Sequence, residues 1–116
     1  MKFNATERMI SILLANEQIA TTVNGEIRPV VARYGAQVPY IVVSTENSDV
    51  RRTKMGGVSG ITSVVMLTIV AESYEQARDL TDSICAIDGK GFEIQGYKED
   101  YGDDKFVVII DTNIDY

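Results

Sequence analysis

Residues 61–71 read ITSVVMLTIVA and form the longest strand pattern in the chain. β-Branched and other apolar residues dominate this stretch, and such residues favour β-strands. Successive strand side chains point to opposite faces, and here both alternating sets are largely apolar: Ile61, Ser63, Val65, Leu67 and Ile69, then Thr62, Val64, Met66, Thr68 and Val70. Each face therefore needs cover. We expect helices on one face and a second copy of this small chain on the other.

Two helices are predicted to supply the first cover. One begins at Asn4, which forms a capping-box pattern with Glu7, and its apolar stripe fades over residues 16–20. The other begins at Ser73, three residues before Gln76, and stops at Asp88-Gly89. The apolar stripes are Met9, Ile10, Leu13 and Leu14 in the first helix and Ala77, Leu80, Ile84 and Cys85 in the second. Cys85 is thus expected to be a small core residue.

Further strands are predicted at residues 40–45, 92–97 and 105–114, with a short extended segment at 26–32 that follows a turn at Asn24-Gly25. Pro29 cannot donate to a sheet ladder, so it indicates an edge position. Residues 46–60, ENSDVRRTKMGGVSG, lack apolar periodicity and are expected to be a long flexible loop, and residues 98–104 an acidic hairpin loop. The resulting order, α-β-β-(long loop)-β-α-β-β, predicts a single α+β domain over residues 1–116, with two helices packed on one face of a mainly antiparallel sheet.

Composition excludes several kinds of chemistry. The 116 residues contain no His, which removes Ser/His/Asp triads and His-containing metal sites, and one Cys, which removes internal disulfides and thiolate clusters. The net charge of −6 is the wrong sign for wrapping nucleic acid or docking on anionic lipid. Residues 1–58 hold 7 basic and 5 acidic residues, whereas residues 59–116 hold 4 basic and 12 acidic, so the halves carry +2 and −8. With no signal-peptide pattern and no membrane-spanning apolar run, we expect a cytosolic protein with protein partners.

Two charged clusters are candidate partner-binding sites. The first is basic and lies in the predicted loop: Arg51, Arg52 and Lys54, with Met55 beside them. It can meet an acidic protein surface or remain solvated, and without interleaved aromatic residues it gives little support to nucleic-acid binding. The second is acidic: Glu99, Asp100, Asp103 and Asp104. Its spacing departs from the calcium-binding loop pattern, so it is a solvated turn or a partner surface.

The remaining motifs favour structural roles. Gly56-Gly57-Val58-Ser59-Gly60 lacks the Gly-Lys-Ser/Thr ending of a phosphate loop, so we expect a flexible loop there. Glu75, Asp79 and Asp82 share a helix face with Arg78, which indicates a solvated surface rather than an acid/base pair. Five tyrosines are interpreted as strand and interface residues: Tyr34, Tyr40, Tyr97, Tyr101 and Tyr116. We therefore predict no catalytic, cofactor-binding or metal-binding residues and no enzyme activity.

Three segments in this order resemble the tail-completion proteins of long-tailed bacteriophages, also called tail terminators or tail-to-head joining proteins: Asn24-Gly25-Glu26-Ile27-Arg28-Pro29 after a Leu-rich helix, Pro39-Tyr40-Ile41-Val42-Val43, and Ala71-Glu72-Ser73-Tyr74-Glu75-Gln76-Ala77. The resemblance covers roughly residues 5–112. It implies a small α+β phage or prophage protein that forms a hexameric ring on the head-proximal end of the tail tube, stops tube polymerisation and joins tail to head. Its implied partners are itself, the tail tube protein and a head completion or connector protein, without a membrane or sequence-specific nucleic acid. Its implied location is the host cytoplasm during assembly and then the virion.

Two other interpretations remain open. An acidic protein that mimics DNA and inhibits a nucleic-acid enzyme would present a duplex-like array of carboxylates, although Arg78, Lys90, Lys98 and Lys105 interrupt the acids here. A small-ligand-binding domain would require a concave polar pocket.

Overall fold

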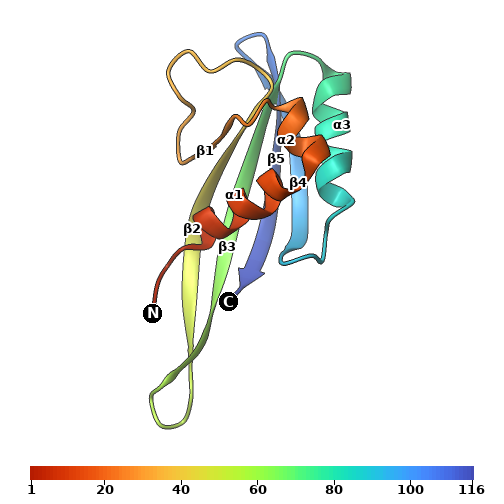
Figure 1. The fold of residues 1–116 in the computed structure, drawn as a ribbon. Coiled ribbons are helices and arrows are strands. Elements are labelled where there is room, and N and C mark those ends of the chain that lie inside the picture. The colour runs from red at the N-terminus through yellow and green to blue at the C-terminus, as the bar shows by residue number, and fades with distance from the viewer.

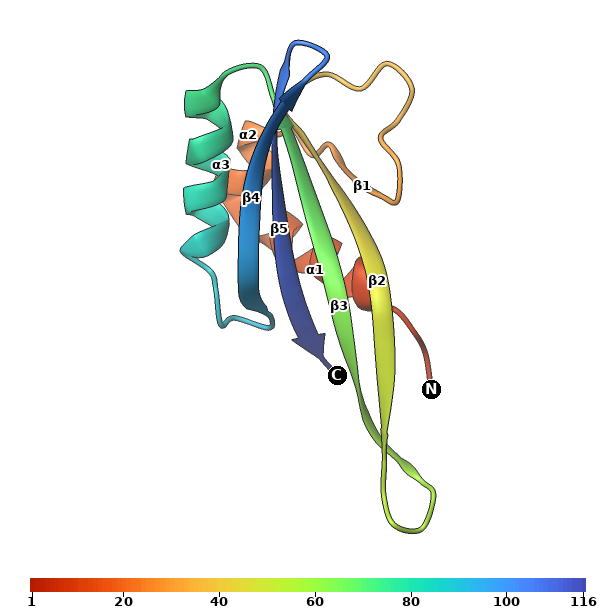
Figure 2. The same cartoon turned by 180° about the vertical axis from the view of Figure 1, so that it is seen from behind.

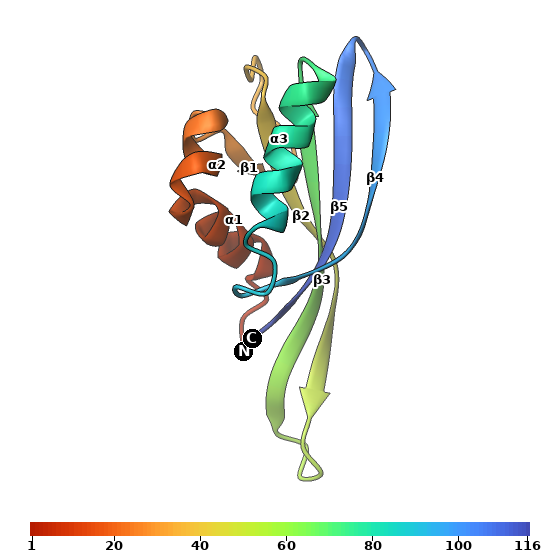
Figure 3. The same cartoon turned by 90° about the vertical axis from the view of Figure 1, so that its right-hand side faces the viewer.

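The computed structural model describes all residues, 1–116, as a layer of helices on a sheet, 52 × 28 × 23 Å in extent. Its elements are α1 (Ala5–Ala15), α2 (Glu17–Thr22), β1 (Ile27–Pro29), β2 (Tyr40–Arg52), β3 (Val58–Ala71), α3 (Tyr74–Cys85), β4 (Glu93–Gly102) and β5 (Lys105–Asp115). All three helices lie on one face of the sheet (Figures 1 and 3). Seen from behind, the other face has no helix in front of it (Figure 2). The α+β class predicted from the sequence is confirmed.

The sheet has five strands in the order β1-β2-β3-β5-β4. β1 pairs with β2 in parallel, and every other pair is antiparallel, so the sheet is mixed but mainly antiparallel as predicted. β3 occupies the centre, which agrees with its apolar residues on both faces. Pro29 ends the short edge strand β1, the position expected for a residue that cannot donate to a ladder.

The first predicted helix is two helices. α1 begins at Ala5 as expected, but Asn4 makes no side-chain cap, because its Oδ1 accepts a hydrogen bond from Nε of Arg8 at 2.9 Å. The chain breaks at Asn16, whose side chain accepts a hydrogen bond from the Ile19 amide at 3.0 Å and caps α2. The sequence analysis interpreted Asn16 as part of the fading end of one helix, whereas it is the cap of a second helix. The predicted count of two helices is therefore wrong.

The capping prediction for α3 is confirmed. Ser73 Oγ accepts a hydrogen bond from the Gln76 amide at 3.1 Å, and the Gln76 side chain accepts one from the Glu72 amide at 3.0 Å. Ala77, Leu80 and Ile84 are buried against the sheet. Cys85 is exposed, so its assignment to the core is wrong. It is the last residue of α3, and its neighbour Ile84 takes the inward position there.

Both predicted long loops are mostly strand. Residues 46–52 continue β2 and residues 58–60 begin β3, so the flexible loop expected at about 46–60 is reduced to a turn over 53–57. Likewise, residues 98–102 continue β4, and only Asp103 and Asp104 form the turn to β5. In both places the strands extend past the helices, so no face is buried and the apolar alternation that identifies a strand is missing.

The core lies between the helices and one face of the sheet. Its fully buried side chains include Met9, Leu13, Ile41, Val43, Val65, Leu67, Ile69, Leu80, Ile84 and Ile110. Burial of each large side chain contributes roughly 1.5–3 kcal/mol to stability. The buried hydroxyls are satisfied: Thr112 donates to the Val65 carbonyl at 2.8 Å, and Ser48 and Ser63 share a hydrogen bond of 2.6 Å across the β2–β3 pair.

The two ends of the chain are joined at one edge of this core. The Tyr116 hydroxyl accepts a hydrogen bond from the Asn4 amide at 3.1 Å, and the Arg8 guanidinium lies 4.5 Å from the centre of the Tyr116 ring. This contact fixes the start of α1 to the end of β5.

Candidate assembly surfaces

A two-stranded arm projects from one end of the sheet. We call residues 46–60 the β2–β3 arm; it ends in the lower hairpin of Figures 1 and 2. Toward the arm, the pairing of β3 with the C-terminal segment ends at Ile61. Ile61 exchanges two backbone hydrogen bonds with Tyr116, at 2.7 and 3.0 Å. From Val50 to Gly60 the arm has no third strand. Its outer part therefore presents two faces and two edges to possible partners.

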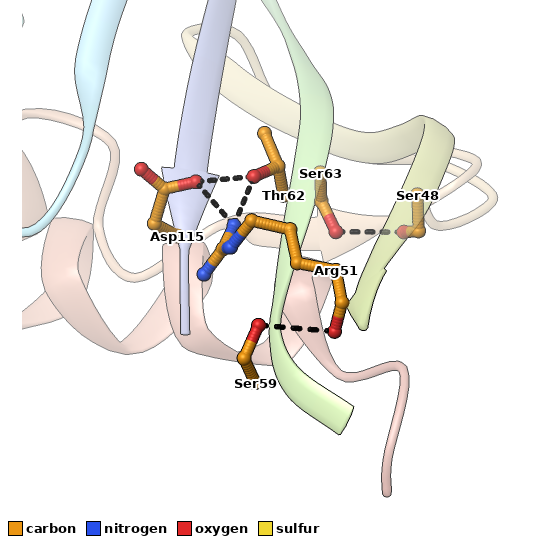
Figure 4. Close-up of polar contacts among 6 residues, drawn as sticks. All are labelled: Ser48, Arg51, Ser59, Thr62, Ser63 and Asp115. Carbon is orange, nitrogen blue, oxygen red and sulfur yellow. Dashed lines mark hydrogen bonds and ion pairs between the residues drawn. The ribbon is translucent and has the colours of Figure 1, made fainter. Parts of the chain in front are cut away.

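Arg51 locks the base of this arm onto β5. Its Nη1 lies 3.2 Å from Oδ1 of Asp115 and also donates to Oγ1 of Thr62, which donates in turn to the same Asp115 oxygen at 2.6 Å (Figure 4). Arg51 reaches this pair by crossing its cross-strand neighbour Gly60. A Cβ on Gly60 would lie 2.1 Å from Nη2 of Arg51, so only glycine leaves the path open. Arg51, one of the predicted partner-binding residues, pairs with Asp115 in the single chain and stays 45% exposed.

The other basic residues lie at the tip. Nη1 of Arg52 donates to the Gly56 carbonyl at 3.1 Å, whereas Lys54 and Met55 are exposed, and Met55 retains 94% of its accessible surface. The turn is held by its own hydrogen bonds. The Thr53 amide donates to the Gly57 carbonyl at 2.7 Å, and the Gly57 amide donates to Oγ1 of Thr53 at 3.0 Å. The tip thus presents a methionine beside basic side chains on an ordered turn.

The predicted acidic residues gather at the opposite end of the molecule. Asp103 and Asp104 form the two-residue turn with φ of 53° and 60°, a left-handed conformation that Asp tolerates better than most residues. Glu99 and Asp100 lie on β4 just before this turn, and all four carboxylates are exposed. The β2–β3 arm and the β4–β5 turn lie at opposite ends of the long axis (Figures 1 and 2). The structure therefore separates the two predicted clusters instead of bringing them together.

An apolar depression lies beside the acidic turn, and the sequence analysis missed it. We call it the aromatic hollow; its volume is about 380 Å³, and it is lined by Tyr74, Ala77, Glu99, Asp100, Tyr101, Phe106, Val107 and Val108. The Phe106 ring centre lies 6.1 Å from that of Tyr74 and 4.9 Å from that of Tyr101. Tyr101 and Phe106 are cross-strand partners, because the turn between β4 and β5 has only two residues. The assumed seven-residue loop hid this pairing.

Carboxylates surround the hollow's rings. A hydrogen bond between the Tyr74 hydroxyl and Glu99, with partial burial and the charge of Glu99, raises the pKa of Tyr74 above its ordinary value of 10.0. The Tyr101 hydroxyl lies 3.4 Å from Oδ1 of Asp104. Exposed aromatic rings next to carboxylates form a surface suited to an apolar group that carries positive charge.

The helix-free face of the sheet is the third surface. Along β3 the side chains alternate between buried positions beneath the helices and half-buried positions on this open face. Register places Thr68 between Val42 and Ile109, and Met66 between Ser44 and Asp111. The open face thus has an apolar centre with polar groups between, and in the single chain nothing covers it (Figure 2).

The remaining groups that the sequence singled out lie on α3 and on several strands and loops. Glu75, Asp79 and Asp82 line an open groove beside α2, and Arg78 pairs with Asp82 at 3.5 Å. No group of three or more Asp, Glu or Cys side chains is arranged to hold a metal ion. None of the three helices has the length and hydrophobicity of a membrane-spanning helix. Of the five tyrosines interpreted as strand and interface residues, Tyr97 and Tyr101 are exposed on β4, and Tyr40 and Tyr116 are half-buried. Tyr34 lies fully exposed in the β1–β2 connection instead of a strand.

Comparison with known proteins gives a likeness of fold. No protein-family model and no curated protein matches the chain. Among solved structures, the chain is similar to one in the virion of a native gene transfer agent particle, with a TM-score of 0.70 and 15% sequence identity. The alignment covers 97% of this chain and 92% of the other. At this identity the likeness shows a shared fold over nearly the whole of both chains.

Proposed function

We propose that this chain is a non-enzymatic structural protein of a phage, prophage or related virion. It acts as a tail terminator: copies form a ring on the head-proximal end of the tail tube, end tube polymerisation and join the tail to the head. The observation that carries the proposal is the shared fold with a chain of a gene transfer agent virion, over almost the full length of both chains. The resemblance of three sequence segments to tail-completion proteins points the same way.

The surfaces of the chain support assembly with protein partners. The open face leaves the apolar side chains of the central strand only half covered, and burying them against another protein would be favourable. The β2–β3 arm extends past the third strand and is held at its base by the Arg51–Asp115 pair. In a ring, one surface of each copy meets a different surface of the next, and a closed set of such contacts needs only one interface type. We propose six copies, the number that the resemblance implies.

The two ends of the long axis carry side chains of opposite charge. Within a ring on a tube, one side meets the last ring of tube protein and the other meets the head connector. Oppositely charged ends favour head-to-tail contacts between neighbouring copies, and the two sides of the ring remain for the tube and the connector.

Localisation in purified particles tests this function. The chain would carry a short epitope tag at an exposed position and be located on intact particles with gold-labelled antibody by electron microscopy. Label at the head–tail junction supports the proposal. Label along the tail, at the distal tip or on the capsid surface would exclude a terminator, and an absence of the tagged chain from purified particles would exclude a virion component.

A further inference from the structure

The two ends of the molecule are complementary to one another in chemistry. One end is the tip of the β2–β3 arm, with Arg52, Lys54 and the exposed Met55. The other is the aromatic hollow with its carboxylates. They lie at opposite ends of a molecule 52 Å long (Figures 1 and 2), so a tip cannot reach the hollow of its own chain. Complementary surfaces that cannot meet within one chain can meet between two copies.

The tip is an ordered turn with an exposed side chain that can insert into another surface. Hydrogen bonds across the turn, including one of 3.0 Å from the Gly56 amide to the Thr53 carbonyl, give it a defined shape before any contact. A preformed segment loses less conformational entropy on binding than a mobile loop does. Met55 projects from it almost fully exposed, and a thioether side chain adapts readily to an irregular apolar surface.

The aromatic hollow has the size and chemistry to bind the methionine and the basic side chains of the tip. Its volume of about 380 Å³ exceeds what one methionine side chain fills, and Tyr74, Tyr101 and Phe106 supply ring faces and edges for the sulfur. Tyr74 and Tyr101 are 50% and 58% exposed, so aromatic surface remains to be covered. Glu99 and Asp100 lie in the lining itself, where they can meet the basic groups on either side of the methionine.

We propose that the tip of the β2–β3 arm of one copy docks in the aromatic hollow of a second copy. Met55 packs against the rings of Tyr101 and Phe106, while Lys54 and Arg52 pair with the carboxylates of Glu99 and Asp100. The proposal rests on the proposed function, since it names the contact that joins neighbouring copies. Each copy offers one tip and one hollow, so the contact is heterologous, and closing it around an axis yields a ring.

Site-directed cross-linking tests the contact. In a Cys85→Ser background, a Met55→Cys chain is mixed with a Tyr101→Cys chain under mild oxidation, and a Met55→Cys chain with a Glu17→Cys chain serves as the control pair. Glu17 is exposed on α2, away from both surfaces. The proposal predicts mixed disulfide dimers forming about tenfold faster in the first pair. Equal rates in the two pairs would overturn it.

Charge reversal provides an independent readout on folded protein. Adding Arg52→Glu and Lys54→Glu to the Met55→Cys chain is expected to lower the cross-linking rate about tenfold, and Glu99→Lys with Asp100→Lys in the Tyr101→Cys chain should restore it. Lys90→Glu, a reversal at an exposed site outside both surfaces, is the control and should change nothing. Reversed charges that leave the rate unchanged, or a loss that the compensating pair does not restore, would contradict the docking.

The same variants separate this contact from the function. The chain can cross-link efficiently, with the rate restored by the compensating charges, and yet be absent from the head–tail junction. That result would support the contact between copies and contradict the terminator role. A chain found at the junction whose pairs never cross-link above control keeps the role and overturns the contact. Capture of purified tail tube protein by the tip, without cross-linking between copies, would assign the arm to the tube and likewise overturn the contact.

Discussion

Replacing Gly60 by alanine probes the lock that holds the β2–β3 arm. The new Cβ would lie 2.1 Å from Nη2 and 2.9 Å from Cζ of Arg51, far inside contact distance, so the flexible guanidinium must leave. Its departure removes the ion pair with Asp115 and the hydrogen bond with Thr62. The fold itself need not change, because only the far end of one side chain is displaced.

The effect of Gly60→Ala on the free energy of unfolding is the sum of two opposing contributions. The Arg51 and Asp115 side chains are 45% and 70% exposed, so the ion pair contributes at most about 1 kcal/mol to the free energy of unfolding. A glycine inside a strand or helix destabilises by roughly 0.5–1 kcal/mol relative to alanine. In the wild-type background the loss and the gain nearly cancel. In an Arg51→Ala background only the gain remains, and Gly60→Ala should stabilise by about 0.5–1 kcal/mol.

A double-mutant cycle in urea, followed by circular dichroism, measures this difference. We expect a coupling energy of about 0.5–1 kcal/mol between positions 51 and 60. Gly96→Ala is the matched control, because a Cβ there meets no atom within 4 Å, and its effect should be the same in both backgrounds. Additive effects of Arg51→Ala and Gly60→Ala within about 0.3 kcal/mol would refute the proposed path of Arg51 over Gly60.

Four further changes have defined outcomes. Leu67→Ala removes a fully buried side chain from the centre of the sheet and should lower the free energy of unfolding by about 2–5 kcal/mol in urea titration, and a loss under 1 kcal/mol would place Leu67 outside the core. Ser73→Ala removes the α3 cap and should cost about 1 kcal/mol, whereas Ser73→Asp should retain most of the stability; equal losses would contradict the cap. Asp104→Gly relieves a left-handed residue in the β4–β5 turn and should raise stability by about 0.5–1 kcal/mol, and destabilisation would count against the turn conformation. Glu99→Gln should lower the pKa of Tyr74 in a tyrosinate absorbance titration, because the carboxylate that favours the protonated phenol is gone. The raised pKa means that this contact stabilises the fold below the ordinary tyrosine pKa and that the benefit is lost as pH rises through the folded-state value; an unchanged titration in Glu99→Gln would refute the Tyr74–Glu99 contact.

Sequence patterns predicted the parts of the fold that have one buried face. The alternation in residues 61–71 identified β3 and correctly indicated that its second face would be left without helices. Ser73 and Gln76 identified the start of α3. In each case a local rule, either the strand period of two or the chemistry of a helix cap, agrees with the tertiary structure.

The predictions that were wrong concern segments in which burial leaves no apolar pattern in the sequence. Residues 46–52 of the arm are exposed or half-buried, and all of them except Val50 are polar or charged, so the segment resembles a loop in sequence. The register shift between Thr45 and Asn47 also breaks the alternation at the point where β2 leaves the core. Asn16 was misinterpreted because the same polar residue can end one helix or cap the next.

The sequence identified the two charged clusters but not the contacts that their residues make. Both charged clusters are where the sequence places them, yet the pairing of Arg51 with Asp115, 64 residues away, depends on strand order and register. The aromatic hollow likewise depends on a turn of two residues that brings Phe106 opposite Tyr101. Long-range pairings of this kind leave no trace in local spacing.

The measurement that tests the terminator role most directly is the length of tails in lysates of the encoding phage or prophage after inactivation of this gene. Electron micrographs of the parent strain supply the length standard, and expression of the intact chain from a separate copy is the control for polar effects. The account predicts tails of uncontrolled length beside filled, unattached heads, with normal joined particles restored by the intact chain. Joined particles with tails of normal length in the inactivated strain would contradict it.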